Sequence, residues 1–554
     1  MKYLYLLYIV LFFPALIQAQ EMAGERVFIH TDKNCYVAGE DIWIKFYVVD
    51  SDLQASPISK IGYIEICDTE RPQIQTKLAI KNGAGIGKIT IPANTSSGIY
   101  QLSGYTRYMR NGNENTFFKK QIAILNIKSQ PESDKISLTD QITEQPSESG
   151  YQQQVLISTD QREYSNRTKV NLSLSNIPEN VVDLVVSVVR NDSLVSLPET
   201  YKQNWTKQIS NISPLAAPLQ WLPELEGHIV TGELIPASSE KHFITNISFV
   251  GDDIRYTNGQ IQENNKFNFY TGDIYGPQEI VTTVISNTYD KVPYRLDILS
   301  PFSESLPDVL PALKVHPEQN RLVERSIGAQ LQELTKTDTL HRQPVSNYYN
   351  LPISLSYNLD EYTRFSTLSE TILEFVKKVR VGKEAGKSKI RVFIEEEQRY
   401  NDGNTLVLLD GIPIYNHEDI LSYNPQYIRK IDIYTGRYVF GGEPFECIVS
   451  FVTRQKNLPF YQLGSESQLF NYDYPFLEEK FYIPDYSDYN TLNSRKPDFR
   501  HTLYWNPSVN VSNKSAELSF YTSDLCGDFQ VVVEGLTDDG KIVSGRSHFS
   551  VRSK

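Results

Sequence analysis

The stretch Thr31-Asp32-Lys33-Asn34-Cys35-Tyr36 recurs 128 residues later as Thr159-Asp160-Gln161-Arg162-Glu163-Tyr164. Each copy leads into a segment in which apolar and polar residues alternate, residues 41–47 after the first copy and residues 169–174 after the second. Alternation of this kind over roughly four to eight residues predicts a half-buried β-strand. Because both copies stand at the start of β-rich sequence, they predict an internal repeat of β domains.

Short strand patterns separated by turn residues surround both copies. Residues 26–127 hold six such patterns and no helical period, which is the signature of a β-sandwich of about 100 residues. Residues 129–150 are rich in Ser, Gln, Glu, Pro and Asp and predict an extended linker. A third sandwich is expected in residues 227–300, and β alternation returns in residues 501–551. The strand patterns of the first domain lie at residues 26–30, 41–49, 61–67, 87–91, 98–108 and 117–127.

A segment in the second half of the chain mixes helix and strand patterns. Thr367 and Glu370 have the spacing of a capping box and mark the start of a predicted helix. The uninterrupted apolar run at residues 406–409 predicts a strand buried on both faces, closed by the turn Asp410-Gly411. Upstream, apolar residues within residues 317–334 recur at helical spacing and predict a connector helix.

The first residues have the features of a secretory signal peptide. Met1-Lys2 is followed by an apolar run at residues 3–17 and then by Ala19, a small residue at the expected cleavage position. Residues 1–19 therefore predict export by a Sec-type signal. Elsewhere the sequence has no apolar stretch of the roughly 18 to 20 residues that a membrane helix needs, so we expect no direct membrane span.

Charge and cysteine content exclude two classes of function. The chain has 54 basic and 67 acidic residues and a net charge of −13, which argues against nucleic acid as a partner because such proteins need dense positive patches. The four cysteines, Cys35, Cys67, Cys447 and Cys526, form no CxxC or Cys/His cluster, so we expect no metal site. A bridge between Cys35 and Cys67 stays open as an alternative to buried free thiols.

Three stretches resemble β-sandwich families. Phe28-Ile29-His30-Thr31-Asp32-Lys33, with Gly39-Glu40 and Ile42-Trp43-Ile44-Lys45, resembles the macroglobulin-type sandwich that opens bacterial alpha-2-macroglobulin-like proteins. Residues 498–507 are similar to a later macroglobulin domain. Residues 227–269 resemble, more loosely, the regulatory sandwich domain of carboxypeptidases.

A fourth stretch resembles the plug domain of TonB-dependent outer-membrane receptors. It comprises residues 406–413, Ile431-Asp432-Ile433, Gly441-Gly442 and residues 448–453, and it departs from that family at Glu446-Cys447, where a small residue is usual. In this order the modules resemble exported proteins of Bacteroidetes-type bacteria. The resemblance implies a mainly β, multidomain chain with tandem Ig/macroglobulin-like β-sandwiches and a small α+β plug-like domain.

The expected domains are a signal peptide at residues 1–19, a macroglobulin-like β-sandwich at 20–128, a linker at 129–150, a second, repeat-like β domain at 151–226, a carboxypeptidase-regulatory-like β-sandwich at 227–300, a connector with a helix at 301–360, a TonB plug-like α+β domain at 361–456 and a C-terminal macroglobulin-like β domain at 457–554.

Two activities of these families are not expected here. Only 101 residues follow Thr453, whereas a 22-stranded barrel needs about 22 strands of roughly ten residues each, so we expect no autonomous transporter. The complete macroglobulins form a thioester between a Cys and a Gln three residues later. The corresponding positions here hold Ala38, Glu70, Ser450 and Phe529, which excludes covalent protease trapping.

No motif predicts an enzyme. The sequence lacks HExxH, Walker-type and GxSxG motifs. His417-Glu418-Asp419 are consecutive and predict a surface turn, and Gly251-Asp252-Asp253 predict a solvated turn instead of a calcium site. We therefore expect no catalytic residues and no cofactor, although a hydrolase that combines His417 and Glu418 with a distant nucleophile stays open as a third hypothesis.

The leading hypothesis is a non-enzymatic exported adaptor or scaffold, periplasmic or associated with the bacterial outer membrane. It would bind another envelope protein, for instance an outer-membrane β-barrel, through the plug-like and C-terminal modules. The predicted partner-binding residues are Asp410, Gly411, Tyr415 and His417. The alternative from a different class is a soluble macroglobulin-like binder of proteases or extracellular ligands that lacks a thioester.

Overall fold

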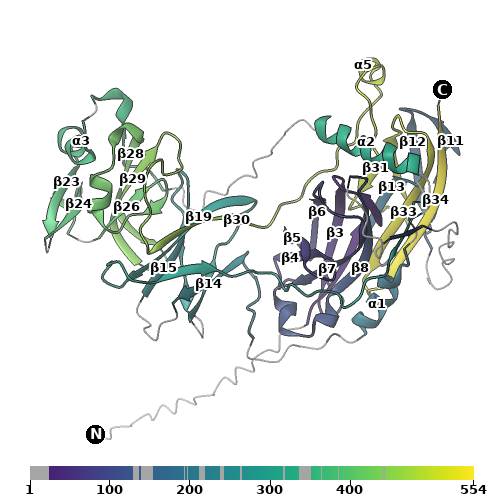
Figure 1. The fold of residues 1–554 in the computed structure, drawn as a ribbon, viewed down its shortest axis with the longest axis horizontal. Helices are drawn as coiled ribbons and strands as arrows, with labels where there is room; N and C mark the ends of the chain where they lie inside the picture. Colours follow the sequence, from purple (N-terminus) through teal and green to yellow (C-terminus); the bar gives the residue numbers. More distant parts are fainter. Residues whose placement is uncertain are drawn as a thin grey trace, which may run out of the picture.

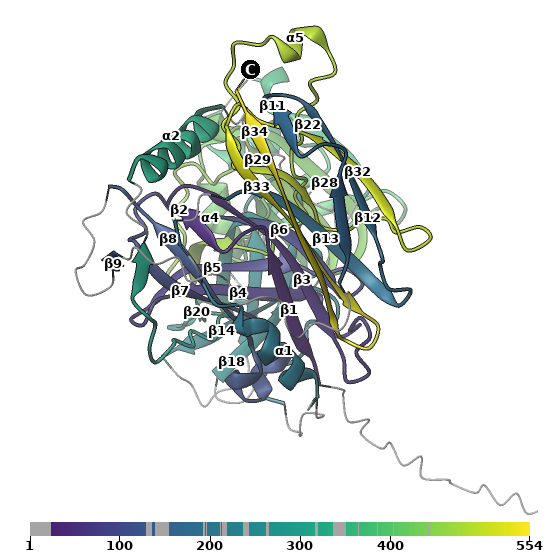
Figure 2. The ribbon, with the colours of Figure 1, turned by 90° about the vertical axis from the view of Figure 1, so that its right-hand side faces the viewer.

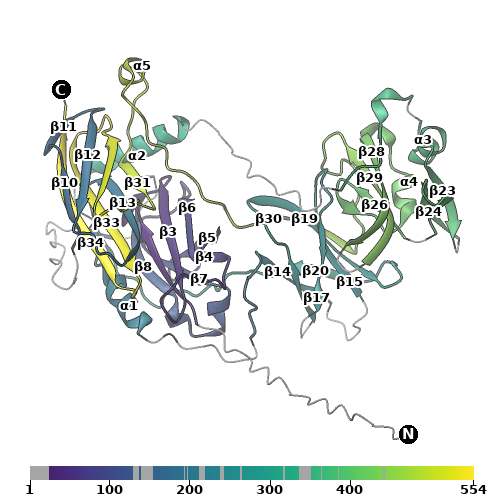
Figure 3. The same cartoon turned by 180° about the vertical axis from the view of Figure 1, so that it is seen from behind.

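The computed structural model of this chain has two lobes that meet at a narrow waist (Figure 1). One lobe contains two β-sandwiches, and the other contains a third sandwich and a small α+β module (Figures 1 and 3). The predicted signal peptide and most of the predicted linker lie outside the described residues. The structure describes residues 24–128, 136–138, 154–191, 194–195, 197–210, 212, 219–236, 243–261, 265–315, 319–335, 351–363, 365–384, 386–402, 404–440 and 443–553.

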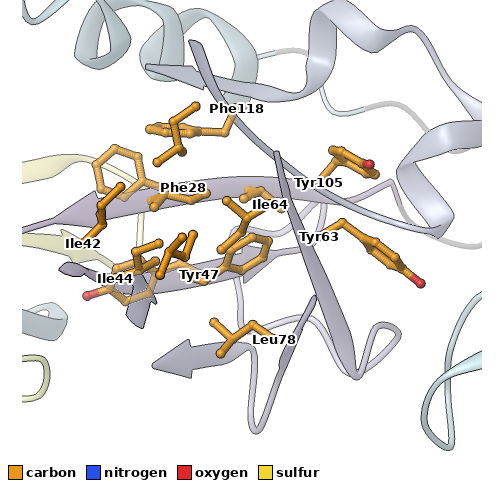
Figure 4. Packing of buried hydrophobic residues seen from close by; sticks show 14 of the residues in the cluster. Phe28, Ile42, Ile44, Tyr47, Tyr63, Ile64, Leu78, Tyr105 and Phe118 are labelled. Atoms are coloured by element: carbon orange, nitrogen blue, oxygen red, sulfur yellow. The ribbon is translucent and has the colours of Figure 1, made fainter. Parts of the chain in front are cut away.

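The first sandwich consists of a three-stranded sheet, β1-β3-β6, packed on a five-stranded sheet, β2-β8-β7-β4-β5. Inward side chains of the two sheets, among them Phe28, Ile64 and Leu78, form one buried cluster (Figure 4). The predicted sandwich in residues 26–127 is therefore present. Its strands are β1 (Arg26–Thr31), β2 (Cys35–Val37), β3 (Asp41–Val49), β4 (Ile61–Cys67), β5 (Pro72–Ala79), β6 (Ala84–Thr90), β7 (Gly98–Thr106) and β8 (Phe118–Leu125).

The first copy of the repeated stretch forms the turn between β1 and β2. The Asp32 carboxylate accepts hydrogen bonds from the backbone N–H of Trp43 (3.1 Å) and from the Tyr36 hydroxyl (2.9 Å). The Thr31 hydroxyl donates to the carbonyl of Lys33 (2.8 Å), and the Lys33 N–H donates to the Tyr36 hydroxyl (3.3 Å). The shared Thr, Asp and Tyr of the repeat are thus the residues that close this turn.

The second copy reproduces these hydrogen bonds at the same offset. Asp160 accepts from the backbone N–H of Asn171 (3.0 Å) and from the Tyr164 hydroxyl (2.6 Å). The Thr159 hydroxyl donates to the carbonyl of Gln161 (2.7 Å), and the Gln161 N–H donates to the Tyr164 hydroxyl (2.9 Å). The repeat predicted from the sequence is therefore a repeated structure.

The second sandwich is built from two segments that are far apart in the chain. Its sheets are β10-β12-β32 and β11-β34-β33-β13-β31, so strands within residues 156–190 pair with strands within residues 502–552 (Figure 2). Its strands are β10 (Leu156–Thr159), β11 (Glu163–Ser165), β12 (Lys169–Ser175), β13 (Val181–Arg190), β31 (Thr502–Asn506), β32 (Ala516–Tyr521), β33 (Gly527–Thr537) and β34 (Ile542–Arg552).

This pairing corrects two predicted domains. We expected residues 151–226 and residues 457–554 to fold separately, whereas their strands, except one at residues 467–473, share both sheets of one sandwich. The physical reason is that four strands leave too many unpaired backbone groups to close a sandwich, so β12 pairs with β32 and β13 pairs with β31 and β33.

The third sandwich agrees with the strands predicted in residues 227–300 and gains one strand from outside that range. Its sheets are β17-β18-β14-β20 and β16-β15-β19-β30. The added strand, β30, pairs antiparallel with β19. The strands are β14 (Ile229–Ile235), β15 (Phe243–Phe249), β16 (Tyr256–Asn258), β17 (Gln260–Ile261), β18 (Lys266–Tyr270), β19 (Pro277–Ser286), β20 (Arg295–Ile298) and β30 (Ser467–Asp473).

The α+β module has a five-stranded sheet, β22-β28-β29-β26-β27, and a three-stranded sheet, β23-β24-β25. Helix α3 (Leu368–Phe375) begins with the predicted capping box of Thr367 and Glu370. All residues of β26 are buried, as its apolar run predicted. The remaining elements are β22 (Leu355–Asn358), β23 (Val379–Glu384), β24 (Lys387–Ile394), β25 (Arg399–Tyr400), β26 (Thr405–Leu409), β27 (Ile412–Pro413), α4 (His417–Leu421), β28 (Ile428–Phe440) and β29 (Glu443–Thr453).

A few elements lie outside these domains. Helix α2 (Gln319–Thr335) confirms the helical spacing of residues 317–334. The short strand β9 (Ile136–Leu138) lies inside the predicted linker and pairs parallel with β21 (Leu313–Val315). Helices α1 (Thr200–Ile209) and α5 (Tyr489–Leu492) complete the fold.

The mainly β, multidomain prediction is therefore confirmed. All four cysteines are free thiols, so Cys35 and Cys67 are not bridged. Among the helices of the described residues, none has the length and apolar character needed to cross a membrane.

Candidate functional site

Asp410 directly follows strand β26 and is buried inside the α+β module. Its carboxylate accepts hydrogen bonds from the backbone N–H of Thr453 (2.7 Å), the Thr453 hydroxyl (2.6 Å) and the backbone N–H of Leu458 (2.8 Å). Burial raises the pKa of this carboxyl, and these hydrogen bonds oppose the rise. The carboxylate therefore ties the end of β26 to the loop that follows β29.

Gly411 completes the turn and touches the third sandwich. Its φ of +82° lies in the left-handed region that favours glycine. A Cβ at this position would lie 2.5 Å from the carbonyl oxygen of Phe249. The backbone N–H of Gly251 donates to the carbonyl of Asp410 (2.9 Å). This turn is therefore a contact between the module and the third sandwich, and both φ and space require glycine.

Tyr415 makes a second contact between the same two domains. Its hydroxyl accepts from the side-chain amide of Asn246 (2.7 Å), and its ring stacks on Tyr289 with 5.6 Å between the ring centroids. Burial raises the pKa of the Tyr415 phenol. A cavity of about 30 Å³ lies beside the ring, which is room for about one water molecule. Tyr415 thus supports the junction and lines no ligand-sized pocket.

His417 is the first residue of α4 and is 5% exposed. Its Nδ1 accepts a hydrogen bond from the backbone N–H of Ile390 in β24 (2.9 Å). Burial, together with the nearby Lys389 charge, lowers the pKa of His417 to about 4, so the imidazole is neutral at neutral pH. The predicted surface turn is corrected for His417, because the inward face of α4 buries it, whereas Glu418 is exposed.

His417 and Glu418 do not have the arrangement that the hydrolase hypothesis requires. The Ser388 hydroxyl donates to the Glu418 carboxylate (3.2 Å) at an exposed position. The Nδ1 of His417 is already occupied by the N–H of Ile390, so it cannot accept a proton from this serine. No nucleophile, base and orienting acid are aligned here.

Asp410, Gly411 and His417 are buried, and the Tyr415 hydroxyl is bonded to the third sandwich. The structure therefore places Gly411 and Tyr415 at the contact with the third sandwich, and the side chains of Asp410 and His417 inside the α+β module. Their side chains do not form an exposed binding surface. The physical reason is that a polar turn next to a buried strand can satisfy its groups within the chain as well as with a partner.

The exposed part of this region is the loop of residues 454–461, which the sequence analysis did not identify. Lys456, Leu458 and Phe460 have φ values of +54°, +57° and +58°, a conformation that is uncommon for such side chains. Phe460 is 82% exposed. No sequence pattern predicts this loop, because Lys, Leu and Phe are not residues that indicate a left-handed backbone conformation.

Two clusters of ionisable groups lie where domains meet. The first, which we call the Glu534 joint, connects the first and second sandwiches. Glu534 is 2% exposed and contacts Nδ1 of His30 (2.5 Å), Nζ of Lys202 (2.7 Å) and the hydroxyl of Tyr201 (3.0 Å). Burial opposes ionisation, but the Lys202 ammonium and the His30 hydrogen bond hold the pKa of Glu534 well below its usual range. Lys202 is itself buried, yet Glu534 raises its pKa.

The second cluster, the Glu224 joint, connects the first and third sandwiches. The Glu224 carboxylate contacts Nδ1 of His228 (2.7 Å) and accepts from the Tyr63 hydroxyl (3.0 Å) and the Ile229 N–H (2.8 Å). Nε2 of His228 meets the Tyr472 hydroxyl (2.8 Å). Burial, followed by the Lys77 charge, lowers the pKa of His228 to about 4. A neutral His228 then donates from Nδ1 to Glu224 and accepts from Tyr472 at Nε2.

Lys77 is the cation of the Glu224 joint. Its Nζ lies over the Tyr472 ring, 4.1 Å from the centroid, and 5.7 Å from the centroid of Phe302. Burial lowers the pKa of Lys77 to about 7, although Glu224 and Asp473 act in the opposite direction. The Glu–His–Tyr chain has the chemistry of a proton relay, but His228 is 0% exposed, so no substrate reaches it.

A groove of about 660 Å³ lies at one end of the first sandwich. It lies between residues 68–73, 92–100 and 310–312, and its lining combines charged, hydroxyl and amide side chains with prolines and apolar residues. The Tyr100 hydroxyl is already bonded to the carbonyl of Ser96 (2.8 Å). The groove can hydrogen-bond polar molecules, and no histidine lies among the residues that line it. Within the described chain, no group of three or more His, Cys, Asp or Glu could hold a metal ion.

Comparison with known proteins identifies no family. No family model matches this sequence, and no curated protein matches it. Among solved structures, the alpha-2-macroglobulin of Escherichia coli activated by porcine elastase is 10% identical, with a TM-score of 0.24, over 96% of this chain and 44% of that chain. The Salmonella alpha-2-macroglobulin reacted with methylamine is 8% identical, with a TM-score of 0.24, over 96% of this chain and 40% of that chain.

An adhesin, InvE of Yersinia pseudotuberculosis, is 10% identical over 49% of this chain and 58% of that chain, with a TM-score of 0.14. This chain therefore spans less than half the length of the macroglobulins to which it is similar. Similarities of this size do not establish a shared function.

Proposed function

We propose that this chain is a non-enzymatic, exported adaptor that binds another envelope protein, and that the α+β module supplies the binding surface. The observation that carries the proposal is the position of the ionisable clusters. Glu534 and Glu224 are buried between sandwiches, and His417 is buried inside the module. The acid–base groups therefore hold the domains in a fixed arrangement, which is the requirement of a scaffold and not of a catalyst.

The resemblance of residues 406–413 to plug domains supports the same proposal. Plug domains work in contact with an outer-membrane barrel, so the resemblance favours an envelope protein, for instance such a barrel, as the partner. The two contacts at Gly411 and Tyr415 set the module on the third sandwich. A module held in this way presents its remaining surface in one orientation, which lowers the entropy lost on binding.

The experiment is chemical crosslinking of the tagged full chain in intact cells, followed by purification from the envelope fraction. We expect a discrete complex with one envelope protein. Recovery of the chain only as a free monomer, in cells where crosslinking of a known envelope complex succeeds, would contradict the adaptor function.

Two glycines of the module provide a matched pair of variants for this experiment. Gly411 and Gly386 have nearly the same φ, +82° and +83°, so alanine introduces similar backbone strain at both. Only at Gly411 would the new Cβ collide with the third sandwich, since nothing lies within 4 Å at Gly386. We expect Gly411→Ala to reduce the yield of the complex at least fivefold and Gly386→Ala to leave it close to that of the wild type.

The alternative, a macroglobulin-like binder of proteases, is separated from the adaptor by an inhibition assay. The purified chain is incubated with trypsin or elastase, and cleavage of a protein substrate is followed. The adaptor predicts no inhibition at equimolar ratio. Inhibition that increases with the amount of chain would favour the alternative.

A further inference from the structure

The loop of residues 454–461, which follows β29, combines backbone strain with an exposed aromatic ring. Lys456, Leu458 and Phe460 all have left-handed backbone, with φ between +54° and +58°. Side chains of this size rarely adopt that conformation. Strained residues persist only where the surrounding structure holds them, and they gather at functional sites. Three of them at alternate positions in one loop therefore call for a physical account.

The surroundings hold this loop firmly on both sides of Phe460. The backbone N–H of Leu458 donates to the buried Asp410 carboxylate (2.8 Å), and the Leu458 side chain is only 9% exposed. The carbonyl of Pro459 accepts from the Tyr423 hydroxyl (2.5 Å), and the N–H of Tyr461 donates to the carbonyl of Leu458 (3.1 Å). The residues on either side of Phe460 are thus anchored, so the position of Phe460 is defined.

Phe460 gains little burial from this arrangement. Its side chain is 82% exposed, and its ring packs on the half-buried Tyr427 with 4.9 Å between the centroids. Burying a phenylalanine ring is among the larger single gains available to a fold. Here the backbone is strained and most of the ring stays in water, so in the isolated protein the ring gains little beyond its contact with Tyr427.

The two basic residues of this loop are both paired with carboxylates. Arg454 forms an ion pair with Asp360, and Lys456 forms one with Asp252. The backbone N–H of Arg454 also donates to the carbonyl of Tyr427 (2.9 Å), the residue on which the Phe460 ring packs. An aromatic anchor with a polar, paired rim is the composition of a protein–protein hot spot.

We propose that Phe460 is the anchor of the interface with the partner, and that it inserts into an apolar pocket on a folded envelope protein. This inference rests on the proposed adaptor function. Arg454 and Lys456 are each paired with a carboxylate, so neither offers an unpaired charge to anionic lipid headgroups or nucleic acid. The ring is 82% exposed and lines neither the groove of the first sandwich nor the small cavity beside Tyr415, so it fills a pocket of the partner instead of receiving a small molecule.

The first experiment places a photo-crosslinking amino acid at position 460 of the full chain in the cells that make it. A second chain carries the same group at position 439, because Val439 is 67% exposed in the same module. We expect one protein adduct of defined mass at position 460 that is absent at position 439. Adducts with lipid, with a second copy of this chain, or equal adducts at both positions would overturn the proposal.

The second experiment uses the protein identified in that adduct, purified and titrated with the full chain by calorimetry. Phe460→Asn removes the ring but keeps a side chain that tolerates left-handed backbone. We expect its affinity to fall at least tenfold, while its melting temperature stays the same or rises because strain is relieved. Val439→Asn is the control, with an affinity within twofold of the wild type.

These outcomes separate this inference from the adaptor function itself. A complex that is purified from wild-type cells and persists with Phe460→Asn overturns the role of Phe460 and leaves the adaptor function standing. Failure to isolate any complex from wild-type cells contradicts the adaptor function and removes the basis for the interface.

Discussion

The Glu534 joint and the Glu224 joint use the same residue types with opposite results for their lysines. Each centres on a buried glutamate that contacts a histidine and a tyrosine. At the Glu534 joint, Lys202 lies 2.7 Å from the carboxylate, and its pKa is raised despite burial. At the Glu224 joint, Lys77 lies over the Tyr472 ring, and burial lowers its pKa to about 7.

The difference shows that direct contact, more than composition, decides whether a buried charge stabilises a domain interface. A carboxylate at hydrogen-bond distance compensates the loss of water around an ammonium group, whereas an aromatic face and a more distant carboxylate compensate it only in part. The first and second sandwiches are therefore joined by matched charges. The first and third sandwiches are joined through a lysine that is close to losing its proton at neutral pH.

The largest change in the free energy of unfolding is expected when the charge of Glu534 is removed from the Glu534 joint. Glu534→Gln leaves the Lys202 ammonium, whose side chain is 1% exposed, with Glu199 as its remaining carboxylate partner. Breaking a buried pair on one side costs about 3 to 5 kcal/mol. Urea denaturation followed by circular dichroism measures the loss. Glu517→Gln, at an exposed position of β32, is the control and should change stability by less than about 0.5 kcal/mol.

The next largest change in the free energy of unfolding should have opposite signs when Lys77 and Lys202 are each replaced by methionine. Lys77→Met removes a poorly compensated charge and should stabilise the chain by about 2 to 4 kcal/mol at pH 6, because each pKa unit corresponds to about 1.4 kcal/mol. Lys202→Met removes a paired charge and should destabilise it by a similar amount. Equal destabilisation by both variants would show that the two joints do not differ.

The gain from Lys77→Met should also depend on pH. The pKa of Lys77 falls from an ordinary 10.5 to about 7 in the folded chain, so between these values the unfolded chain binds more protons. Wild-type stability from this group therefore rises as pH increases from about 7 to about 10.5, and the penalty is fully present below pH 7. The difference between Lys77→Met and wild type, measured by urea denaturation, should shrink steadily between pH 7 and pH 10.

A smaller loss of stability is expected when the carboxylate of the Glu224 joint is replaced. Glu224→Gln keeps one oxygen that can accept a hydrogen bond from Tyr63 or the Ile229 N–H. Unlike Glu534→Gln, it does not remove a carboxylate that forms an ion pair with a buried lysine. A loss of about 1 to 3 kcal/mol is expected, the range for an unsatisfied buried hydrogen-bonding group. Hydrogen exchange of β14 should speed up in this variant, with β33 unchanged. A loss as large as that of Glu534→Gln would contradict the contrast between the joints.

The smallest effect distinguishes the two copies of the repeated turn. Asp32 is 2% exposed and also accepts from the Thr502 hydroxyl (2.8 Å) in the second sandwich. Asp160 is exposed, and its second oxygen accepts from the Asn171 side chain (3.1 Å). Asp32→Ala should therefore lower the free energy of unfolding by about 1 kcal/mol more than Asp160→Ala. Equal losses would mean that the domain contact adds nothing to the turn.

Local features of this protein could be predicted because neighbouring residues determine them. The repeated turn depends on hydrogen bonds of Asp32 and Tyr36 to groups no more than 11 residues away. The capping box of Thr367 and Glu370 likewise closes within one helical turn. The apolar run of residues 406–409 needed only its own composition to predict a buried strand.

The candidate site could be located from the sequence but not interpreted. The turn Asp410-Gly411 was predicted, yet its burial results from Phe249 and Thr453, which are remote in the sequence. His417 was expected in a surface turn, and contact with β24 buries it. No sequence pattern identifies Phe460, because its exposure depends on a backbone conformation imposed by Asp410 and Tyr423.

By itself, the sequence of this protein determined the strands, the capped helix and the two copies of a hydrogen-bonded turn, because each depends on contacts over a short stretch. Tertiary structure alone decided that β13 pairs with β31 and β33, more than 300 residues later. It also decided that Lys202 forms an ion pair with the Glu534 carboxylate, whereas Lys77 lies over the Tyr472 ring. Strand partners and buried charge pairs depend on which surfaces come together in space, and no local pattern records that choice.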